Sequence, residues 1–220
     1  MAAFVRFPST IWTTISNSPE RARSRVFSAY RVPIFNYILN QGFSEHDAED
    51  ISQEVFIRVC KEEFLRRVDR SKGTFRSLLL AVTRHVIDYE RQRRRKGRAV
   101  SVEQGGFDGG RIDIPAEVKS DKGFDDLWVK NLTRLGLQRL QEECSSGGPK
   151  YYDALVLSKL QGLGYAQIAD KLGSRVTDIT NWVHHAKKKF KVYVLEAVRA
   201  YSSSEAEYKA ELALINRFLR

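Results

Sequence analysis

The chain has 220 residues, 42% of them hydrophobic, with a formal net charge of +10 at pH 7 and a pI of about 9.7. This length allows one large domain or two small domains with separate cores, and the basic balance indicates a polyanionic partner, most often nucleic acid. Its two cysteines, Cys60 and Cys144, fit no CxxC pattern, which argues against a disulfide framework and favours a reducing cytoplasm. Residues 1–16 lack the basic start and apolar core of a signal peptide, and no run reaches the ~18 apolar residues of a membrane-spanning helix.

Hydrophobic residues recur at helical spacing and strand-like alternation is absent, so we expect an all-α fold with two helical domains joined by a flexible linker. The linker prediction rests on the glycine-rich stretch QGGFDGGRIDIPAEVKSDKG, which has no apolar period. The predicted division is a first domain at 1–98, the linker at 99–124, a second domain at 125–200 and a helical tail at 201–220. In the tail, Ser204 and Glu207 have the spacing of a capping box.

The clearest helix of the first domain follows Ser44, a good N-cap residue. Its core stripe consists of residues that recur at helical spacing, namely Ala48, Ile51, Val55, Phe56 and Val59. The opposite face carries Asp47, Asp50, Gln53, Glu54 and Arg58. The residue pattern leaves two interpretations open: a solubilising surface, or a docking surface for a basic protein partner.

A long helix is predicted from about Thr74 to Arg95, after a loop at 68–73. Residues 84–98 read RHVIDYERQRRRKGR, and seven of these fifteen are Lys or Arg. Approximately one face of the helix carries Arg84, His85, Asp88, Arg91 and Arg95. A solvated basic face and a membrane-surface helix are alternatives, but nucleic acid explains the segment best because a second candidate DNA-binding block lies downstream.

That second block contains a short predicted helix at 166–172, then Gly173, then a longer helix that starts near Thr177. Glycine readily takes the left-handed conformation of a sharp turn, so the pattern is typical of a helix-turn-helix. Short polar side chains that could contact base edges are Thr177, Thr180, Asn181, His184 and His185. Cations that could hold phosphates are Lys187, Lys188, Lys189 and Lys191. The alternative is a solvated helix end whose lysines are favoured by the helix dipole.

The sequence contains no HExxH, P-loop or GxSxG motif, and adjacent histidines diverge on a helix and make a poor metal pair. We therefore expect no enzyme activity, no metal and no cofactor. A recombinase or nuclease would need a nucleophile or a carboxylate cluster, and neither is evident. A stand-alone helix-turn-helix transcriptional regulator is the principal alternative function.

Three stretches, taken together, resemble the sigma-70 family of RNA polymerase sigma factors, specifically the extracytoplasmic-function (ECF) type. DAEDISQEVFIRV resembles region 2.2, GTFRSLLLAVTRHVIDYERQRRR resembles regions 2.3 to 2.4, and GLGYAQIADKLGSRVTDITNWVHHAKKKF resembles region 4.2. The first domain is then similar to sigma region 2 and the second to sigma region 4. The pattern is also similar to planctomycete-like members.

The resemblance implies a factor that binds core RNA polymerase, directs it to promoter −10 and −35 elements and melts the DNA. The polymerase β′ clamp helices would contact Asp47, Asp50, Gln53, Glu54 and Arg58. The −10 element would contact Asp69, Arg70, Ser71 and Lys72 in the loop that holds a flipped base, and Arg84, His85, Asp88, Arg91 and Arg95. The −35 element would contact Thr177, Thr180, Asn181, His184, His185, Lys187 and Lys188.

The implied partners are core polymerase, through its β′ clamp helices and β flap, and promoter DNA in the bacterial cytoplasm, without membrane insertion. An anti-sigma factor is a further partner that the resemblance suggests. Family members often carry Trp at the position of Leu78, Asn at that of His85, and a basic residue at those of Thr180 and His185. Promoter sequence preferences are therefore not carried over.

Overall fold

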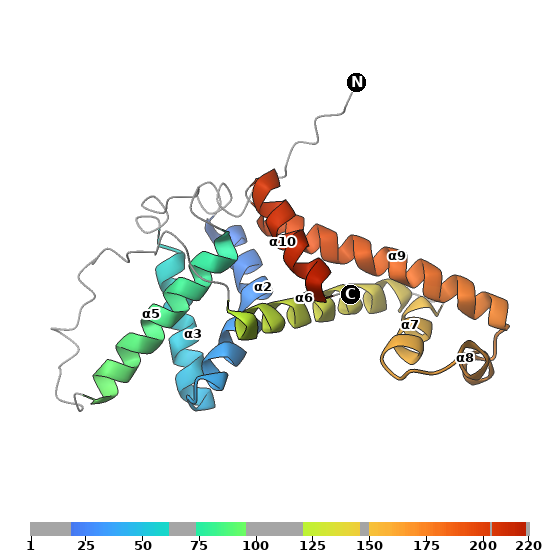
Figure 1. Ribbon diagram of the computed structural model, residues 1–220, viewed down its shortest axis with the longest axis horizontal. Coiled ribbons are helices and arrows are strands. Elements are labelled where there is room, and N and C mark those ends of the chain that lie inside the picture. The colour runs from blue at the N-terminus through green and yellow to red at the C-terminus, as the bar shows by residue number, and fades with distance from the viewer. Residues whose placement is uncertain (1–18, 62–73, 96–120, 146–149, 203, 219–220) are drawn as a thin grey trace, which may run out of the picture. The chain divides into compact units, whose positions relative to one another are not determined.

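The protein is described here by a computed structural model that places residues 19–61, 74–95, 121–145, 150–202 and 204–218. Within these ranges the regular elements are α-helices and no strand occurs, so the predicted all-α class is confirmed. The helices are α2 (Pro19–Asn40), α3 (Glu45–Val59), α5 (Phe75–Arg95), α6 (Lys122–Cys144), α7 (Tyr151–Lys159), α8 (Tyr165–Leu172), α9 (Val176–Tyr201) and α10 (Glu205–Phe218), as labelled in Figure 1. They form two compact units: unit 1 comprises residues 1–129 and 200–220, and unit 2 comprises residues 130–199.

Unit 1 is built on α2, α3 and α5, which contact one another. Ser44 caps α3 as predicted, because its hydroxyl accepts a hydrogen bond from the Asp47 amide at 3.2 Å. The predicted stripe of α3 is buried, and so is the stripe of α5 from Phe75 to Val86. Pro33 lies inside α2, which remains one helix from Pro19 to Asn40.

The start of α6 and the whole of α10 also belong to unit 1. Phe124 and Trp128 are fully buried, and the Phe124 ring packs edge-on against Tyr37 with centroids 5.5 Å apart. The α6 helix begins at Lys122, inside the predicted linker range, and most of that range lies outside the described residues. The boundaries of the two units differ from the predicted domain boundaries. The start of α6 joins unit 1 through the buried Phe124 and Trp128, and α10 joins it through Glu207 and Glu211, which contact α5.

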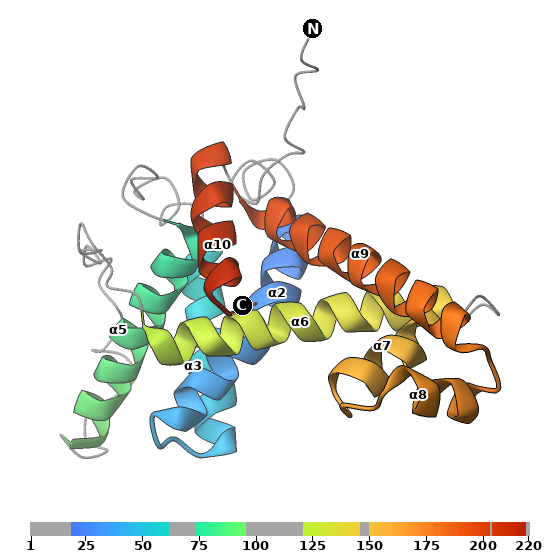
Figure 2. The same cartoon turned by 45° about the vertical axis from the view of Figure 1, so that its right-hand side comes forward.

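Unit 2 contains the helix-turn-helix, formed by α8 and the start of α9 beside α7 (Figure 2). Gly173 has φ +63°, in the left-handed conformation that the sequence predicted for the turn. The core beneath it consists of Ala154, Leu157, Ile168, Ala169, Ile179 and Val183. The α7 helix ends at Lys159, and the apolar Leu160 that follows it is 67% exposed.

Candidate nucleic-acid and protein interfaces

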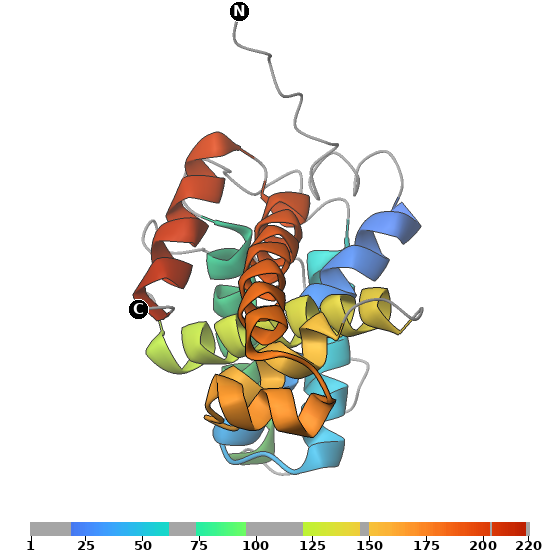
Figure 3. The same ribbon diagram turned by 90° about the vertical axis from the view of Figure 1, so that its right-hand side faces the viewer.

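The first part of α9 follows the turn of unit 2, as the ribbon of Figure 3 shows. Its outer face carries a row of exposed polar side chains. Its buried face is Ile179, Val183 and Ala186, which pack on the unit 2 core. Since these residues fix the rotation of the helix, the polar residues between them must face outward. All seven residues predicted to contact a −35 element are exposed: Thr177, Thr180, Asn181, His184, His185, Lys187 and Lys188.

Two of these polar side chains already have contacts within unit 2. The Thr180 hydroxyl donates to the Val176 carbonyl at 3.0 Å, which leaves its oxygen as an acceptor for a base or a phosphate. His185 stacks on the Tyr151 ring of α7 with centroids 5.7 Å apart. Asn181 lies between them in sequence, with both its amide donor and its carbonyl acceptor on an exposed side chain.

The lysines of α9 fall into two groups. Lys189 pairs with Glu143 of α6, and this contact raises the pKa of the Lys189 ammonium. Lys187, Lys188 and Lys191 are exposed, and no carboxylate of the described residues pairs with them. These three can therefore neutralise phosphates without breaking an internal ion pair, whereas Lys189 cannot.

The start of α9 is held by a local ion pair. Asp178 accepts from the Arg175 guanidinium at 3.0 Å and from the Arg175 amide at 3.4 Å. The hydrogen bond from the Arg175 side chain lowers the pKa of the Asp178 carboxyl. An ionised carboxylate in the first turn of a helix is favoured by the helix dipole, so Asp178 stabilises the end of α9 that carries the polar row.

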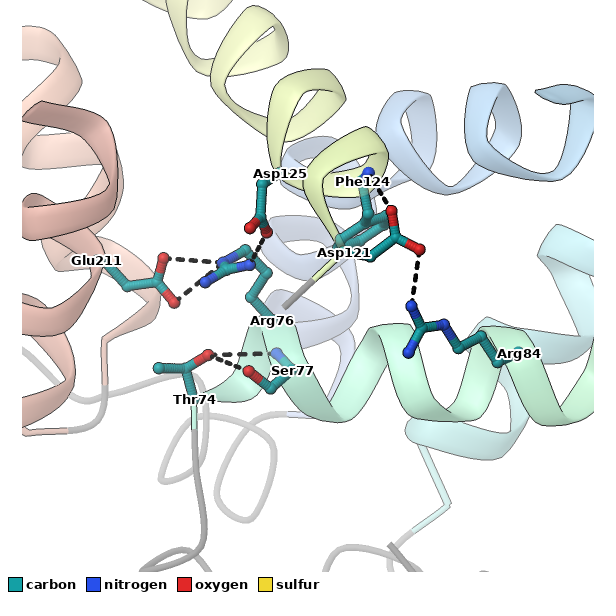
Figure 4. A network of polar contacts seen from close by, with 8 residues as sticks. All are labelled: Thr74, Arg76, Ser77, Arg84, Asp121, Phe124, Asp125 and Glu211. Carbon is teal, nitrogen blue, oxygen red and sulfur yellow. Dashed lines mark hydrogen bonds and ion pairs between the residues drawn. The ribbon is translucent and has the colours of Figure 1, made fainter. Parts of the chain in front are cut away.

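In unit 1, the basic face of α5 is only partly available, because several of its arginines have acidic partners. The Arg84 guanidinium donates to Asp121 at 2.7 Å and to the Tyr37 hydroxyl at 3.3 Å, and Figure 4 shows the Arg84–Asp121 contact beside the start of α6. Burial alone would raise the pKa of Asp121, but the hydrogen bonds from Arg84 and Tyr37 outweigh it and lower this pKa.

Farther along α5, Arg91 donates to the Gln41 carbonyl at 3.1 Å and lies 5.7 Å from the centroid of the Phe43 ring. Arg94 pairs with Asp47, one of the predicted polymerase contacts. This places Asp47 in an internal bridge between α3 and α5. Arg95 and Asp88 are exposed on the same helix.

His85 is exposed at the surface of α5. Partial desolvation lowers the pKa of its imidazole below the usual 6.5, and the nearby charge of Arg58 lowers it further, against the opposing effect of Asp88. The neutral imidazole is therefore favoured at neutral pH. A neutral His85 can accept as well as donate a hydrogen bond, which suits a base edge better than a phosphate.

The predicted acidic face of α3 is divided by the structure. Asp50 and Gln53 are exposed, and Glu54 is 42% exposed in its side chain. Arg58, however, was expected on the outer face and is 7% exposed; its Nε donates to Glu54 one turn earlier. Arg58 is buried because its position lies beside Val55 and Val59 on the core side of the helix. The residues that remain available to a partner are thus Asp50, Gln53 and Glu54.

The four predicted loop residues of the −10 site, Asp69, Arg70, Ser71 and Lys72, lie outside the described residues. In the part of the chain that the structure places, no group of three or more His, Cys, Asp or Glu side chains could hold a metal ion. Among the helices of that same part, none has the length and apolar character needed to cross a membrane.

Comparison with known proteins gives matches to two parts of one family. A family model described as Sigma-70 region 2 matches residues 26–96, and one described as Sigma-70, region 4 matches residues 149–190. The chain belongs to the sigma-70 family. It is also 30% identical over 151 residues to the ECF RNA polymerase sigma factor SigE of Mycolicibacterium smegmatis, over 69% of this chain and 53% of that relative. The chain thus spans about half the length of the curated relative that it matches.

The family membership predicted from the sequence is confirmed, and this relative supports the predicted ECF type; the planctomycete-like assignment stays a prediction. The sigma-70 region 2 match covers α3, α5 and most of α2, and the region 4 match covers α7, α8 and the first part of α9. The matches thus include both the acidic residues of α3 and the polar row of α9.

Two features of the candidate interfaces were not identified from the sequence. Asp121 pairs with Arg84 although it belongs to the predicted linker, and α10 contacts the first turn of α5. Both lie outside the ranges matched by sigma-70 regions 2 and 4. The sequence signal for α10 was the capping-box spacing of Ser204 and Glu207, which does not say on which surface the helix packs.

Proposed function

We propose that this chain is a transcription initiation factor that binds core RNA polymerase and directs it to promoters through −10 and −35 elements. The observation that carries the proposal is the presence of sigma-70 regions 2 and 4 in one chain, with the candidate contact residues of region 4 exposed along α9. The factor would act by binding in the bacterial cytoplasm rather than by catalysis, and it would need no cofactor.

In the proposed mechanism, α9 enters the major groove of the −35 element. Asn181 has the donor and acceptor geometry for adenine, and Thr180 and Thr177 are short enough to contact a base edge or a thymine methyl group. Lys187 and Lys188 would hold phosphates and so fix the register of the helix on the duplex.

The −10 element would be bound by α5 in unit 1, with the loop at 68–73 holding a base that leaves the stack. Capture of a single strand in a basic groove supplies binding energy for opening the duplex. The guanidinium groups of Arg84 and Arg91 donate hydrogen bonds to acceptors within the protein. Binding of the DNA strand would replace these contacts with contacts to phosphates. His85, Asp88 and Arg95 would complete the strand-binding face.

Polymerase docking is proposed for the exposed acids of α3, with Asp50 and Glu54 facing basic residues of the β′ clamp helices and Gln53 between them. Asp47 and Arg58 would contribute indirectly, since their side chains bridge to Arg94 and Glu54. The β flap contact of unit 2 and an anti-sigma partner are proposed from the family alone.

The test is run-off transcription with core polymerase, with and without the chain, on fragments of the source genome. We expect initiation at defined positions only when the chain is present. Asp50→Lys should abolish co-purification with core polymerase, whereas Glu142→Lys, the same charge change at an exposed site of unit 2, should not. If the chain binds duplex promoters tightly without core enzyme and transcription is independent of it, it is instead a stand-alone helix-turn-helix regulator.

A further inference from the structure

Unit 1 contains a buried ion cluster that joins helices from three separate parts of the chain (Figure 4). Arg76 of α5 donates from Nε to Glu211 of α10 at 3.0 Å and pairs through a terminal nitrogen with Asp125 of α6. The three residues are 8%, 0% and 2% exposed, respectively. The guanidinium also lies 5.2 Å from the centroid of the Trp128 ring. A buried cation is tolerated only when it is paired and hydrogen-bonded, and α10 supplies one of its two carboxylates.

A second carboxylate of α10 reaches the end of α5. Glu207, 7% exposed, accepts a hydrogen bond from the Phe75 amide at 2.6 Å. The sequence predicted that Glu207 would close a capping box with Ser204. One half of that box is present, since the Ser204 hydroxyl accepts from the Glu207 amide at 3.1 Å. The Glu207 carboxylate, however, lies on the Phe75 amide, 132 residues away in sequence.

The first turn of α5 needs this carboxylate for a simple electrostatic reason. The N-terminus of a helix carries unpaired N–H groups and a partial positive charge, and the first turn of α5 has no acidic residue. Arg76 adds a further positive charge at that end. Thr74 accepts a hydrogen bond from the Ser77 amide at 3.2 Å, so the helix caps one of its own amides, and Glu207 caps another.

The docking of α10 uses these carboxylates as well as apolar contact. Among the α10 side chains that the structure describes, the buried ones are Glu207, Tyr208, Glu211 and Ile215, and Leu212 and Leu214 are half-buried. A helix of 14 residues is marginal on its own in water. Because this buried face includes two carboxylates, it needs a surface that presents a cation and amide donors at the matching positions, and the start of α5 offers Arg76 and the Phe75 amide.

We propose that α10 is the cap of α5, and that Glu207 and Glu211 are positioning residues for the helix that contacts the −10 element. The proposal rests on the proposed function, since α5 carries Arg84, His85 and Arg91. Unit 1, which would bind the −10 element, is then completed by a helix that follows region 4 in the sequence. That helix, α10, supports the function of region 2. Neither α10 nor Asp125 falls within the ranges that the family models match.

The test measures backbone hydrogen exchange of the full chain, followed at the first turn of α5. Glu207→Ala removes the acceptor of the Phe75 amide, and we expect exchange at residues 75–79 to become roughly tenfold faster. Glu207→Gln keeps an acceptor and loses the charge, so it should give a smaller increase. Glu205→Ala, an exposed position of the same helix, is the matched control and should leave this exchange unchanged. Amides of α9 report on unit 2 and should also be unaffected.

A transcription assay on two templates separates an effect on the position of α5 from an effect on the stability of unit 1. On a duplex promoter, Glu207→Ala should initiate more slowly than wild type at equal folded concentration. A template already unpaired at the −10 element should reduce that defect, because the strand no longer has to be captured from the duplex. Unchanged exchange at residues 75–79 in both Glu207→Ala and Glu211→Gln would overturn the cap, and equal defects on the two templates would overturn the positioning role. If wild type itself fails to support transcription, the proposed function falls, while the exchange result still decides whether α10 caps α5.

Discussion

At the residue scale, Asp121 has two separable roles. Its carboxylate accepts from the Phe124 amide at 3.2 Å, which caps α6, and it pairs with Arg84 at 2.7 Å. Asparagine caps helices about as well as aspartate, so Asp121→Asn should lose the ion pair alone, whereas Asp121→Ala loses both. We expect Asp121→Ala to lower the free energy of unfolding by about 1–2 kcal/mol, and Asp121→Asn by about half of that, since the pair is partly exposed to solvent.

Denaturant titration measures this difference, with Asp126→Asn as the control at the neighbouring turn of α6. Equal losses for Asp121→Asn and Asp121→Ala would show that the charge, and not the cap, accounts for the contribution of Asp121. No loss in either variant would show that neither contact stabilises unit 1.

His85 gives a prediction about pH. Desolvation lowers the pKa of its imidazole below 6.5 in the folded chain, so the folded state binds fewer protons than the unfolded state just below that pH. Stability from this group is therefore complete above about pH 6.5 and is lost as the pH falls below it. His85→Gln should reduce the stability difference between pH 7.5 and pH 5.5. Thermal unfolding at the two pH values compares His85→Gln with the wild type, and an unchanged difference would contradict this contribution of His85.

At the element scale, α6 and α9 approach closely at Gly136 in unit 2. A Cβ atom built on Gly136 would lie 2.9 Å from the Phe190 ring and 3.0 Å from Val194. A larger residue must therefore push the helices apart, although leucine favours helix formation more than glycine does. We expect Gly136→Leu to lower the free energy of unfolding by about 2 kcal/mol, as measured by urea denaturation. Lys130→Leu, an exposed position of the same helix, should cost far less, and equal effects would contradict close packing at Gly136.

Helical periodicity predicted the rotation of α3, α5 and α9 correctly, because each has one apolar stripe that decides which side is buried. The exposed residues of α9 followed from that rotation. Arg58 shows where the pattern fails: its position lies at the edge of the stripe, and its long side chain is buried with Glu54 as a partner. Leu160 shows a second limit of the pattern, because it is apolar and yet exposed just after the end of α7 at Lys159.

At the scale of the whole molecule, the order of segments along the sequence suggested two domains and a tail. Unit 1 instead includes the start of α6 and the whole of α10. Long-range pairs such as Glu207 with Phe75 cannot be predicted from one sequence, since each residue has an adequate local explanation. Glu207 matched a capping box with Ser204, and no motif of the sequence singled out Arg76. Only the folded arrangement shows that the carboxylates of α10 complete α5.

The net charge of +10 overstates the number of phosphates that unit 2 can neutralise. If all ten net positive charges each contacted one phosphate, the slope of log affinity against log salt would be about −9 on duplex DNA. On the part of α9 that would enter the groove, Lys189 has a carboxylate partner, whereas Lys187, Lys188 and Lys191 are exposed without one among the described residues, and these three are the cations that face the duplex in the proposed mechanism. We therefore expect a slope of about −3 for duplex DNA containing a −35 element.

Fluorescence anisotropy of the full chain on a labelled duplex, titrated with salt, measures this slope. Lys188→Gln should make it less steep by about 1 unit, because one phosphate contact is lost. Lys209→Gln makes the same charge change at an exposed position of α10 and should leave the slope unchanged. Equal effects of the two substitutions would mean that the duplex responds to total charge rather than to the lysines of α9, and the placement of the −35 interface on α9 would then have to be abandoned.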